Sequence, residues 1–456
     1  MSVIHQFEEI IQESKAACER ICRDSRDLEK AGVREFFVTE EIGSGSGREA
    51  DMLALGDNVD FMAYLICHRQ MEGKIKLIYI DPPFFSKAKY DAVIQLRGKD
   101  GKRLPPVRYF AYDDTWQKDM TGYLKMLCLR LYMMKELLAD DGTIWVHLDW
   151  HVVHYVKVLM DEIFGEKNFV NEIIWQYKSG GSGKRHYARK HDTILVYSKS
   201  SQYYLCPGKE KSYNRGFKPY RFKGVKEYRD EAGWYTMVTM KDVWHVDMVG
   251  RTSAERTGYA TQKPEALLKR IIEGATKEGD ICADFFCGSG TLAAVASDTG
   301  RRWICCDESP LAVAGALKRI SSRNDHAEVL KTGEYTQGGG RPLLRLDRES
   351  IAGSDKSLIR ISLKGYLLKE IPPFIDIKAA DIIRTAEKND PLQLVEYWSV
   401  DFDYDGRIFR PEMIFSKKGS EIVAVCEKLI AADKAISICV KTVDVFGNSN
   451  LSLIGR

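Results

Sequence analysis

The sequence predicts an α/β protein whose main domain is a doubly wound, mostly parallel sheet and whose C-terminal domain is β-rich. Between residues 51 and 150, and again between 264 and 320, helical patterns alternate with short apolar runs. That alternation is typical of a parallel sheet with helices on both faces. From about residue 357 onward, strand-like runs follow one another. The 456 residues, 44% hydrophobic and 29% charged, have the composition of a globular protein of two or three domains.

The elements of the first half follow from hydrophobic periodicity. Residues 3–30 carry an amphipathic pattern, and we expect an N-terminal helical segment over 1–50. The next segment, 51–177, is expected to form one half of the sheet domain. Asp140-Asp141-Gly142 within it is typical of a helix end. The elements expected there are helices over 58–67 and 123–138 and strands over 77–80, 143–148 and 172–177.

The second half of the sheet domain is separated from the first by a long basic region, 178–258, which contains a strand over 193–198. Helix and strand patterns alternate again over 259–332. Residues 333–356 are expected to be a linker, because glycines gather near their start. A C-terminal β-rich domain is expected over 357–456. Its predicted strands cover 358–363, 394–400, 407–415, 422–425 and 436–445.

Charge is unevenly distributed along the chain. The net charge is only +3, yet the segment from Lys178 to Arg229 holds fourteen Lys and Arg against three acids. Aromatic residues are interleaved with these cations. A concentrated cationic patch on an otherwise acidic protein indicates a binding surface for polyanions.

Cysteine use and hydropathy bear on the compartment. The eleven cysteines include no Cys-x-x-Cys pair, which argues against zinc and disulfide frameworks and favours a reducing cytoplasm. No run of about 18 apolar residues occurs, so no transmembrane helix and no membrane partner are expected. The N-terminal residues lack a basic-then-apolar signal pattern, and we therefore expect a cytoplasmic protein.

The most informative stretch is Asp81-Pro82-Pro83-Phe84, which directly follows the apolar run 77–80. Two prolines have no N–H to donate, so they end the strand and stiffen the turn. The carboxylate of Asp81 and the carbonyl of Pro82 are then two acceptors held side by side with an aromatic ring behind them. This arrangement is suited to holding the exocyclic amine of a planar ring. The alternative is a simple strand-ending turn.

A second motif runs from Asp284 to Thr291 and reads as a strand, a glycine-rich turn and a helix. Gly288 and Gly290 allow a ligand to approach the backbone, and the following helix presents its N-terminal amides. Asp307 ends the next strand, about twenty residues on, where an acid can accept from both hydroxyls of a ribose. This motif alone also fits a dinucleotide, so the ligand stays ambiguous without the first motif.

Together, Asp81–Phe84 and Asp284–Thr291 resemble the β group of S-adenosylmethionine-dependent DNA amino-methyltransferases, in which the catalytic motif precedes the cofactor motif. The stretch 259–272 is similar to that family's Thr-Gln-Lys-Pro helix, and 55–58 to its Gly-Asp-Asn element. Residues 171–175 and 191–199 resemble elements of its type III-like modification enzymes. The matches span roughly 53–320. The chain departs from the family pattern at Phe285, where a proline is usual, and at Phe84, where tyrosine is common.

The resemblance implies a Rossmann-like methyltransferase fold with permuted motif order, and transfer of a methyl group from S-adenosylmethionine to N6 of an adenine flipped out of double-stranded DNA. Asp81 and Pro82 would accept from the amine, while Phe84 would stack on the base; Pro83 completes the catalytic set. The resemblance implies cofactor contacts from Asp57, Lys263, Asp284, Phe286, Gly288, Ser289, Gly290, Thr291 and Asp307. Asp57 would accept from the cofactor's adenine amine, and Lys263 would meet its methionine carboxylate; the alternatives are a capping acid and a solvated lysine.

The basic region is the candidate for target recognition. Its cations suit phosphates, and arginine can also read guanine edges; the alternative is a solvated basic surface. The predicted DNA-binding residues are Lys178, Lys184, Arg185, Arg189, Lys190, Arg215, Lys218, Arg221 and Lys223.

Several alternatives remain open at this stage. Cytosine N4 is the nearest rival target, although Asp81 favours adenine where serine would favour cytosine, and an inactive DNA-binding or specificity homologue is a further reading. A second copy of the chain, or a restriction or helicase subunit, are the candidate partners, and association with the nucleoid would follow from DNA binding. Asp401 to Glu412 has the spacing of a calcium loop, but expected strands flank it, so no metal is predicted.

Overall fold

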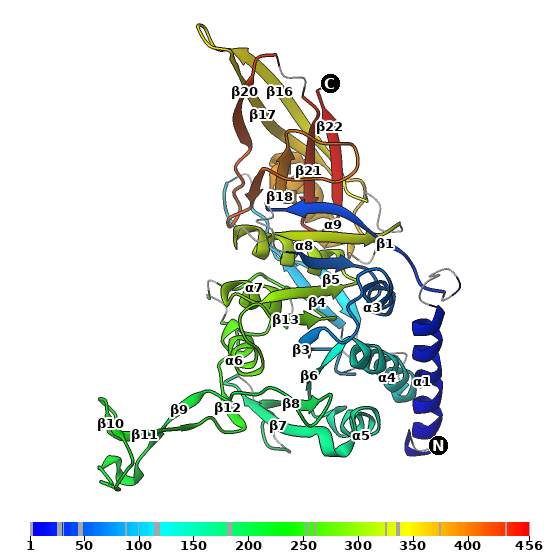
Figure 1. The fold of residues 1–456 in the computed structure, drawn as a ribbon. Coiled ribbons are helices and arrows are strands. Elements are labelled where there is room, and N and C mark those ends of the chain that lie inside the picture. The colour runs from blue at the N-terminus through cyan, green and yellow to red at the C-terminus, as the bar shows by residue number, and fades with distance from the viewer. Residues whose placement is uncertain are drawn as a thin grey trace.

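The computed structural model shows a sheet domain with the C-terminal domain at one end of it (Figure 1). Among the described residues, no helix is both long and apolar enough to span a bilayer. The residues described are 3–24, 30, 32–43, 49–86, 89–98, 100–113, 119–179, 185–250, 253, 255–259, 261–323, 326–333, 338–373, 375–433 and 436–455.

The main sheet has ten strands in the order β1-β15-β2-β14-β13-β3-β6-β8-β7-β12. The run from β15 to β6 is parallel throughout, β7 and β12 pair in parallel, and β1 and β8 pair antiparallel with their neighbours. The predicted doubly wound, mostly parallel sheet is therefore confirmed. The strands are β1 Phe36–Ile42, β2 Asp51–Leu55, β3 Ile75–Ile80, β6 Leu138–Leu148, β7 Phe169–Gln176, β8 His191–Ser198, β12 Val243–His245, β13 Ile281–Asp284, β14 Arg302–Asp307 and β15 Ala327–Thr332.

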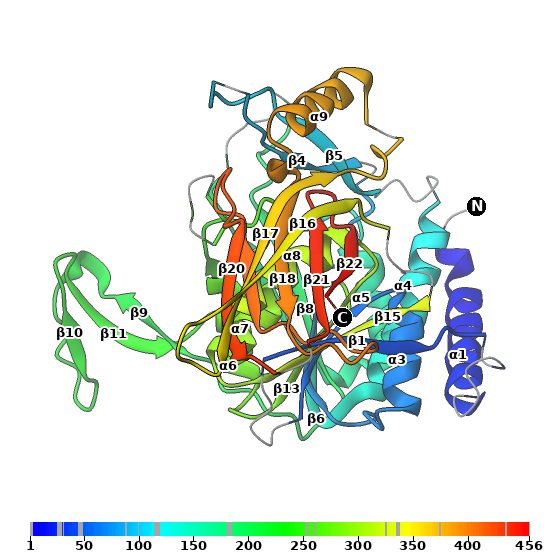
Figure 2. The same cartoon turned by 90° about the horizontal axis from the view of Figure 1, so that it is seen from above.

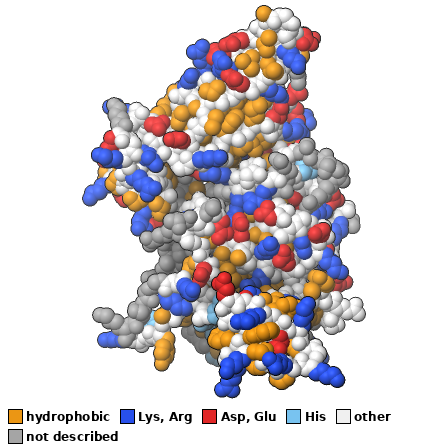
Figure 3. All heavy atoms as spheres, turned by 90° about the vertical axis from the view of Figure 1, so that its left-hand side faces the viewer, with side chains coloured by type: hydrophobic (Ala, Val, Ile, Leu, Met, Phe, Trp, Pro, Cys, Tyr) orange, Lys and Arg blue, Asp and Glu red, His pale blue; other side chains and the backbone are white. Residues whose placement is uncertain are grey.

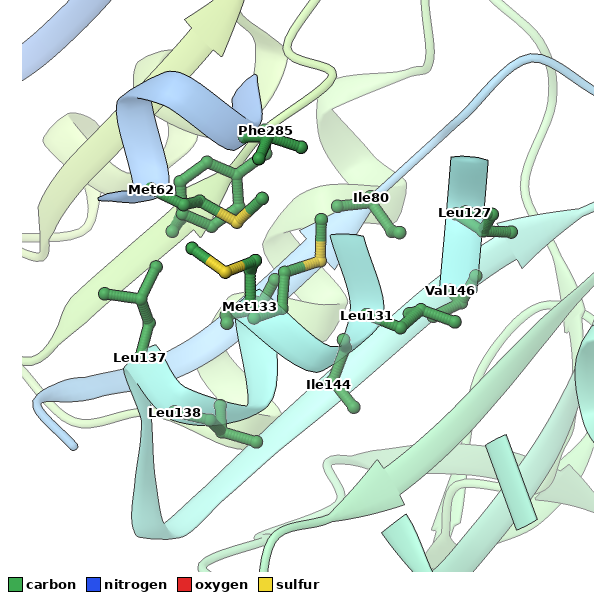
Figure 4. Packing of buried hydrophobic residues seen from close by; sticks show 14 of the residues in the cluster. Met62, Ile80, Leu127, Leu131, Met133, Leu137, Leu138, Ile144, Val146 and Phe285 are labelled. Atoms are coloured by element: carbon green, nitrogen blue, oxygen red, sulfur yellow. The ribbon is translucent and has the colours of Figure 1, made fainter. Parts of the chain in front are cut away.

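Helices cover both faces of this sheet and form two separate cores. One core joins α3, α4 and α5 to the sheet, and the other joins α6, α7 and α8 to the opposite face. Figure 4 shows the first core, where Met62 of α3 and Met133 of α4 pack with Ile80, Ile144 and Phe285. The helices are α3 Asn58–Cys67, α4 Met120–Leu137, α5 Val153–Phe164, α6 Glu265–Ala275, α7 Thr291–Asp298 and α8 Pro310–Ile320.

The N-terminal segment is only partly helical, so the expected boundary at residue 50 is wrong. Helix α1 (Phe7–Asp24) packs against α4, as Figure 1 shows, and buries Ile10 and Ile21. Strand β1 then joins the edge of the main sheet by pairing with β15. Its alternating burial pattern is short, and its partner β15 lies almost 300 residues away in the sequence, which hid it from local analysis.

The basic region contributes two strands to the main sheet and one projecting arm. Strands β8 and β12 belong to the main sheet, whereas β9 (Lys209–Tyr213), β10 (Glu227–Arg229) and β11 (Trp234–Thr239) form a separate three-stranded sheet. Figures 1 and 2 both show this sheet extending away from the body. We call residues 209–239 the arm.

The C-terminal domain combines two small sheets with one helix. The sheets are ordered β16-β17-β20 and β19-β18-β21-β22. Helix α9 (Ile377–Asn389) was not predicted, and β16 lies inside the expected linker 333–356, which therefore ends near residue 340. The strands are β16 Arg341–Ser350, β17 Lys356–Leu367, β18 Val395–Asp401, β19 Met413–Ser416, β20 Val425–Ala431, β21 Ile438–Asp444 and β22 Ser449–Ile454.

A hairpin that follows the catalytic motif is part of the C-terminal core. Strands β4 (Lys89–Ile94) and β5 (Val107–Asp113) lie beside α9 (Figure 2). Ile94, Leu96 and Val107 are buried in the same cluster as the C-terminal core residues. Arg97 N donates to Gln393 Oε1 at 2.7 Å, and Gln393 Nε2 donates to Arg97 O at 3.2 Å. The assignment of all of 51–177 to the sheet domain is therefore wrong for this hairpin.

A buried ion pair ties the C-terminal domain to the edge of the main sheet. Lys441 of β21 donates to Glu40 of β1 at 2.6 Å, and both side chains are almost fully buried. Although burial would raise the pKa of Glu40, the charges of Lys441 and Lys331 hold it below its ordinary value. Strand β20 exposes the apolar side chains of Val425 and Leu429. Figure 3 shows a hydrophobic area in the upper half of the molecule.

Candidate active site

The two motifs lie side by side at the carboxyl edge of the sheet. Strand β13 pairs in parallel with β3 on one side and with β14 on the other. Asp81 directly follows β3, Asp284 ends β13 and Asp307 ends β14. Ligands bind at this edge of open α/β sheets. The three carboxyl groups therefore face one shared space.

Asp81 keeps one oxygen free within this space. Lys263 Nζ donates to its Oδ2, and the two side chains are 10% and 18% exposed. Its Oδ1 is buried and has no hydrogen-bond partner among the described residues. Buried polar atoms are rarely left unpaired, and such exceptions often mark binding or catalytic sites. This oxygen therefore lacks the partner that a buried acceptor normally has.

The backbone after the two prolines is irregular. Phe85 adopts a left-handed conformation (φ 56°), which is uncommon for a bulky residue and marks local strain. The Phe85 ring is buried against Tyr123, 5.8 Å between centroids. The Phe84 ring instead stays half-buried, with Lys263 Nζ 5.2 Å from its centroid. The strained turn thus separates a core ring from a ring that borders the site.

A buried polar network supports the Phe84 ring from the neighbouring strands. His147 of β6 lies 5.9 Å from the Phe84 centroid and is fully buried. Its Nδ1 is 2.9 Å from the Tyr79 hydroxyl, and its Nε2 is 3.2 Å from Asp192 Oδ2. Tyr177 donates to the other oxygen of Asp192 at 3.1 Å. Four strands, β3, β6, β8 and the end of β7, are joined in this way.

The protonation pattern of this network follows from its pKa shifts. Burial would raise the pKa of Asp192, but the hydrogen bonds from His147 and Tyr177 hold it below its ordinary value. Burial also keeps the pKa of Tyr79 well above its ordinary value, so this phenol stays protonated. An ionised Asp192 only accepts, so His147 donates from Nε2 and accepts from Tyr79 at Nδ1. Each hydrogen bond of the network then has one donor and one acceptor.

The glycine loop is shaped for close approach of a ligand. Gly288 (φ 48°) and Gly290 (φ 72°) both have left-handed backbones. A Cβ on Gly290 would lie 2.7 Å from the Ala316 Cβ, so only glycine fits there. Arg319 donates to Thr291 Oγ1 at 3.0 Å and to the Ser289 carbonyl at 3.4 Å, which braces the loop from α8.

Asp307 and Asp284 are carboxyl groups in a poorly solvated space. Asp307 accepts from Gly288 N at 2.8 Å and from Ser309 N at 2.9 Å, yet burial raises its pKa to about 6. Burial, together with the charges of Asp81 and Asp307, keeps the pKa of Asp284 well above its ordinary value. Asp284 Oδ1 accepts from Phe286 N at 2.9 Å. Perturbed carboxyl groups of this kind cluster at functional sites.

Two predicted cofactor residues have protein partners in the structure. Asp57 caps α3 by accepting from Val59 N at 2.7 Å and pairs with Arg130 at 2.8 Å. Lys263 contacts Asp81, so its charge acts at the catalytic motif. Asn58, next to Asp57, donates to the Phe285 carbonyl at 2.8 Å and links the segment 55–58 to the glycine motif. Cofactor contacts from Asp57 and Lys263 stay predictions.

The predicted DNA-binding residues lie on two exposed segments. Lys178, Arg185, Arg189 and Lys190 border the loop between β7 and β8, and all but the half-buried Lys190 are exposed; Lys184 lies outside the described residues. The other four, Arg215, Lys218, Arg221 and Lys223, are exposed at the tip of the arm between β9 and β10. Figure 3 views the molecule from the arm's side and shows hydrophobic side chains ringed by Lys and Arg in its lower part.

Internal carboxylates order the arm. Glu227 accepts from the backbone N–H groups of Tyr220 and Arg221, each at 2.8 Å. Asp230 accepts from Lys211 at 2.7 Å and from Tyr213 at 2.9 Å, and the hydrogen bond from Lys211 lowers its pKa to about 2. These bonds hold the tip in a defined shape with its cations outward.

Sequence reasoning missed the network of His147, Asp192 and Tyr177. Their ring and carboxyl groups come from three strands, and only the sheet order brings them together. A signal was present, because a histidine two residues before Asp149, near the end of a buried run, is unusual for a core strand.

The described part of the chain holds no group of three or more His, Cys, Asp or Glu arranged to bind a metal. Within the calcium-like loop, Asp401 accepts from Asp403 N at 2.9 Å and Arg410 N at 2.8 Å. Asp405 pairs with Arg410 at 2.6 Å. These carboxylates therefore form hydrogen bonds and an ion pair within the loop itself.

Comparison with known proteins gives a matching family and several relatives. A family model described as DNA methylase matches residues 75–318. Type II methyltransferase M.EcaI of Enterobacter cloacae is 28% identical over 342 residues, covering 61% of this chain and 72% of that protein. DNA adenine methyltransferase YhdJ of Escherichia coli K12 is 25% identical over 253 residues, covering 54% and 76%. The solved structure of the M1.HpyAVI–SAM complex aligns over 59% of this chain and 98% of that chain, with a TM-score of 0.37 and 18% identity.

The matched range contains both motifs, the Thr-Gln-Lys-Pro helix and the basic region, and it covers more than half of the chain. The predicted class of enzyme is confirmed: the chain belongs to the DNA methylase family.

Proposed function

We propose that this enzyme transfers a methyl group from S-adenosylmethionine to the N6 amine of an adenine flipped out of double-stranded DNA. The observation that carries the proposal is the free, buried Oδ1 of Asp81 beside a strained, proline-stiffened turn. An amine that enters this space would give that oxygen the donor it lacks. The stiff turn also limits how far the acceptor can move.

The glycine loop fits the cofactor. Gly288 and Gly290 give the loop its left-handed backbone, Gly290 packs against Ala316, and Asp307 offers acceptors next to them. Phe286 and Ser289 belong to the same loop, Thr291 begins the helix that follows it, and Asp284 ends the strand before it. S-adenosylmethionine, when bound, supplies an electrophilic methyl group. The residues that would hold it are Asp284, Phe286, Gly288, Ser289, Gly290, Thr291 and Asp307, with Asp57 and Lys263 at the margins.

Asp81 and Pro82 activate the amine. The lone pair of an aromatic amine is delocalised into its ring, so the free amine is a poor nucleophile. Two acceptors, the Asp81 carboxylate and the Pro82 carbonyl, favour a more tetrahedral nitrogen with an available lone pair. Lys263 neutralises the far oxygen of Asp81 and leaves the near one for the substrate. Because the groups are already in place, positioning provides much of the rate enhancement.

Phe84 receives the base. A target inside the duplex must be unstacked, which costs a few kcal/mol, and stacking on an aromatic side chain returns about 1–3 kcal/mol. The ring of Phe84 borders the space at Asp81 and is backed by His147, Tyr79 and Asp192. This rigid backing fixes the plane in which the base lies.

Adenine is the favoured target for two reasons. The catalytic motif begins with Asp81, where serine would favour cytosine. Among the relatives, YhdJ carries the name of a DNA adenine methyltransferase. Cytosine N4 presents a similar amine and is the second candidate that the assay below separates from the first.

The arm and the loop between β7 and β8 would hold the DNA backbone. Their exposed cations, Arg185, Arg189, Arg215, Lys218, Arg221 and Lys223 among them, suit phosphates. Two relatives are named as Mod subunits of type III restriction-modification enzymes, EcoP15I of Escherichia coli and HindVI of Haemophilus influenzae. A restriction subunit, or a second copy of this chain, is the partner that we propose for the C-terminal domain. A cytoplasmic location with nucleoid association follows from this function.

The test is transfer of a radioactive methyl group to unmethylated DNA, followed by digestion and separation of the nucleosides. We expect label in N6-methyladenine; label in N4-methylcytosine would refute the adenine assignment, and no label on any DNA would favour an inactive homologue. Asp81→Ala should abolish transfer and leave cofactor affinity within about threefold, because Asp81 acts on the amine. Transfer that survives this substitution would refute the mechanism.

A further inference from the structure

Trp150 differs from the other tryptophans of this chain. Trp145, Trp175 and Trp244 are at most 5% exposed, whereas Trp150 is 45% exposed, the highest value among the described tryptophans. It lies two residues after the end of β6, at the carboxyl edge that holds Asp81. Single exposed hydrophobic residues are common on protein surfaces, so its role depends on how it is held and where it lies.

The turn around Trp150 is held by charged groups. His151 N donates to Asp149 Oδ1 at 2.9 Å, and its Nδ1 lies 2.6 Å from Asp149 Oδ2. The guanidinium of Arg189 lies 3.8 Å from the centroid of the Trp150 ring, and the His151 ring lies 3.7 Å from it. A cation over an aromatic face is a favourable contact. The ring is thus held in place while nearly half of its surface stays open.

The sheet register places this ring close to the catalytic motif. Strands β3 and β6 are parallel with Ile80 opposite Val146, so Asp81 lies beside His147. Trp150 follows His147 by three residues, which is at most about 10 Å along an extended chain. Successive bases along one DNA strand are about 3.4 Å apart. A nucleotide at Asp81 therefore has its neighbours within reach of Trp150.

Arg189 connects this ring to the basic region. It is exposed, two residues before β8, in the segment that carries Arg185 and Lys190. A phosphate backbone that follows these cations would pass over Trp150. Bulky apolar side chains inserted between base steps are a common way to open a duplex.

We propose that Trp150, held by Arg189, is the wedge that enters the base stack beside the flipped adenine. The inference rests on the proposed function, since it needs a target base at Asp81 and Phe84. The ring occupies the space that the base leaves and keeps the neighbouring pairs apart. Trp150 acts on the stack, and it is a positioning residue because it contacts neither the amine nor the methyl donor.

The test compares single-turnover methylation on two duplexes that carry the recognition sequence, which sequencing of methylated DNA provides. In one duplex the target adenine is paired with thymine, and in the other it faces an abasic site. We expect Trp150→Ala to lose about 10–100-fold in rate on the paired duplex and to stay within about threefold of the wild type on the abasic one. Trp150→Phe should keep most of the rate on both.

Equal losses on both duplexes would overturn the inference, because they would place Trp150 in catalysis or folding. No loss on the paired duplex would overturn it as well. A duplex with 2-aminopurine at the target gives a second readout: the fluorescence rise on binding should fall in Trp150→Ala and persist in Asp81→Ala. An unchanged rise in Trp150→Ala would count against the wedge.

Two control variants complete the design. Phe37→Ala removes another exposed aromatic ring, which is 53% exposed and lies on β1, an outermost strand of the sheet. This variant should match the wild type on both duplexes. Arg189→Ala should slow the paired duplex more than the abasic one if it supports the wedge, whereas a plain phosphate contact would weaken both equally. Failure of the proposed function would appear separately, as absence of methylation by the wild type.

Discussion

Cofactor affinity should depend on the ionisation of Asp307. Burial raises the pKa of this carboxyl to about 6, even though it accepts from Gly288 N and Ser309 N. If Asp307 accepts from the ribose hydroxyls of S-adenosylmethionine, the ionised form is the stronger acceptor. Affinity should therefore fall as the pH drops through 6.

The magnitude follows from the ionised fraction. With a pKa of about 6, roughly nine tenths of Asp307 is ionised at pH 7 and roughly one tenth at pH 5. If only the ionised form binds, the apparent Kd rises in proportion to the loss of that fraction, about tenfold between pH 7 and pH 5. Isothermal titration of S-adenosylmethionine into the protein at pH 5, 6, 7 and 8 measures it.

Two variants make the test specific to Asp307. Asp307→Asn should weaken binding at pH 7 and remove the dependence between pH 5 and 7. Asp444 also has a pKa raised to about 6 by burial, but it lies in the C-terminal domain against Tyr366, so Asp444→Asn should keep the dependence. A Kd that stays flat from pH 5 to 8, or a slope that persists in Asp307→Asn, would refute the assignment.

The same group links pH to the stability of the cofactor-free protein. The pKa in the folded state lies above the ordinary value of about 3.9, so the folded state favours the neutral acid. This contribution is complete below pH 4 and is lost as the pH rises through 6. It amounts to roughly 3 kcal/mol. Denaturant unfolding at pH 4 and pH 7 measures this loss. The unfolding free energy should fall less between these two pH values in Asp307→Asn than in the wild type.

Three further predictions test the catalytic ion pair, the hairpin and the arm. Lys263→Met leaves a largely buried Asp81 without its cation, so the unfolding free energy should fall by about 3–5 kcal/mol and the methylation rate at least about 100-fold. Lys263→Arg should recover part of both. Wild-type kinetics for Lys263→Met would contradict this role. Leu96→Ala should lower unfolding free energy by about 2–5 kcal/mol, against less than about 1 kcal/mol for the exposed Leu343→Ala; equal effects would argue against a shared core. Replacing the four arm cations by alanine should weaken DNA binding and reduce its salt dependence without changing cofactor affinity, and an unchanged salt slope would remove the arm from the DNA interface. The cations are Arg215, Lys218, Arg221 and Lys223.

The parallel sheet could be predicted because its signals are local. Each central strand is an apolar run, as at 77–80 before Asp81, and some helices have a capping side chain, such as Asp57 before α3 and Ser309 before α8. The positions of the two motifs at one edge also followed, since parallel strands end on the same side. Those same rules could not set strand order, and the order is what places Asp81 beside His147.

The C-terminal boundary could not be predicted because it is a matter of long-range burial. The hairpin 89–113 follows the catalytic motif in sequence, but Leu96 is buried among side chains nearly 300 residues later in the chain. The local sequence pattern of β4 and β5 does not show which distant residues their apolar face packs against. The same holds for β1, whose partner strand begins at Ala327.

This arrangement gives the C-terminal domain a role in the position of the catalytic turn. The chain leaves Phe84, makes the strained turn at Phe85 and within about ten residues enters the C-terminal core at Ile94. Strain at a functional site persists only where the surrounding structure holds it. The Phe85 ring packs against Tyr123, and the hairpin that follows is bonded through Arg97 to Gln393 of the C-terminal domain. The segment that follows Asp81–Phe84 in the sequence and the C-terminal domain therefore share one core.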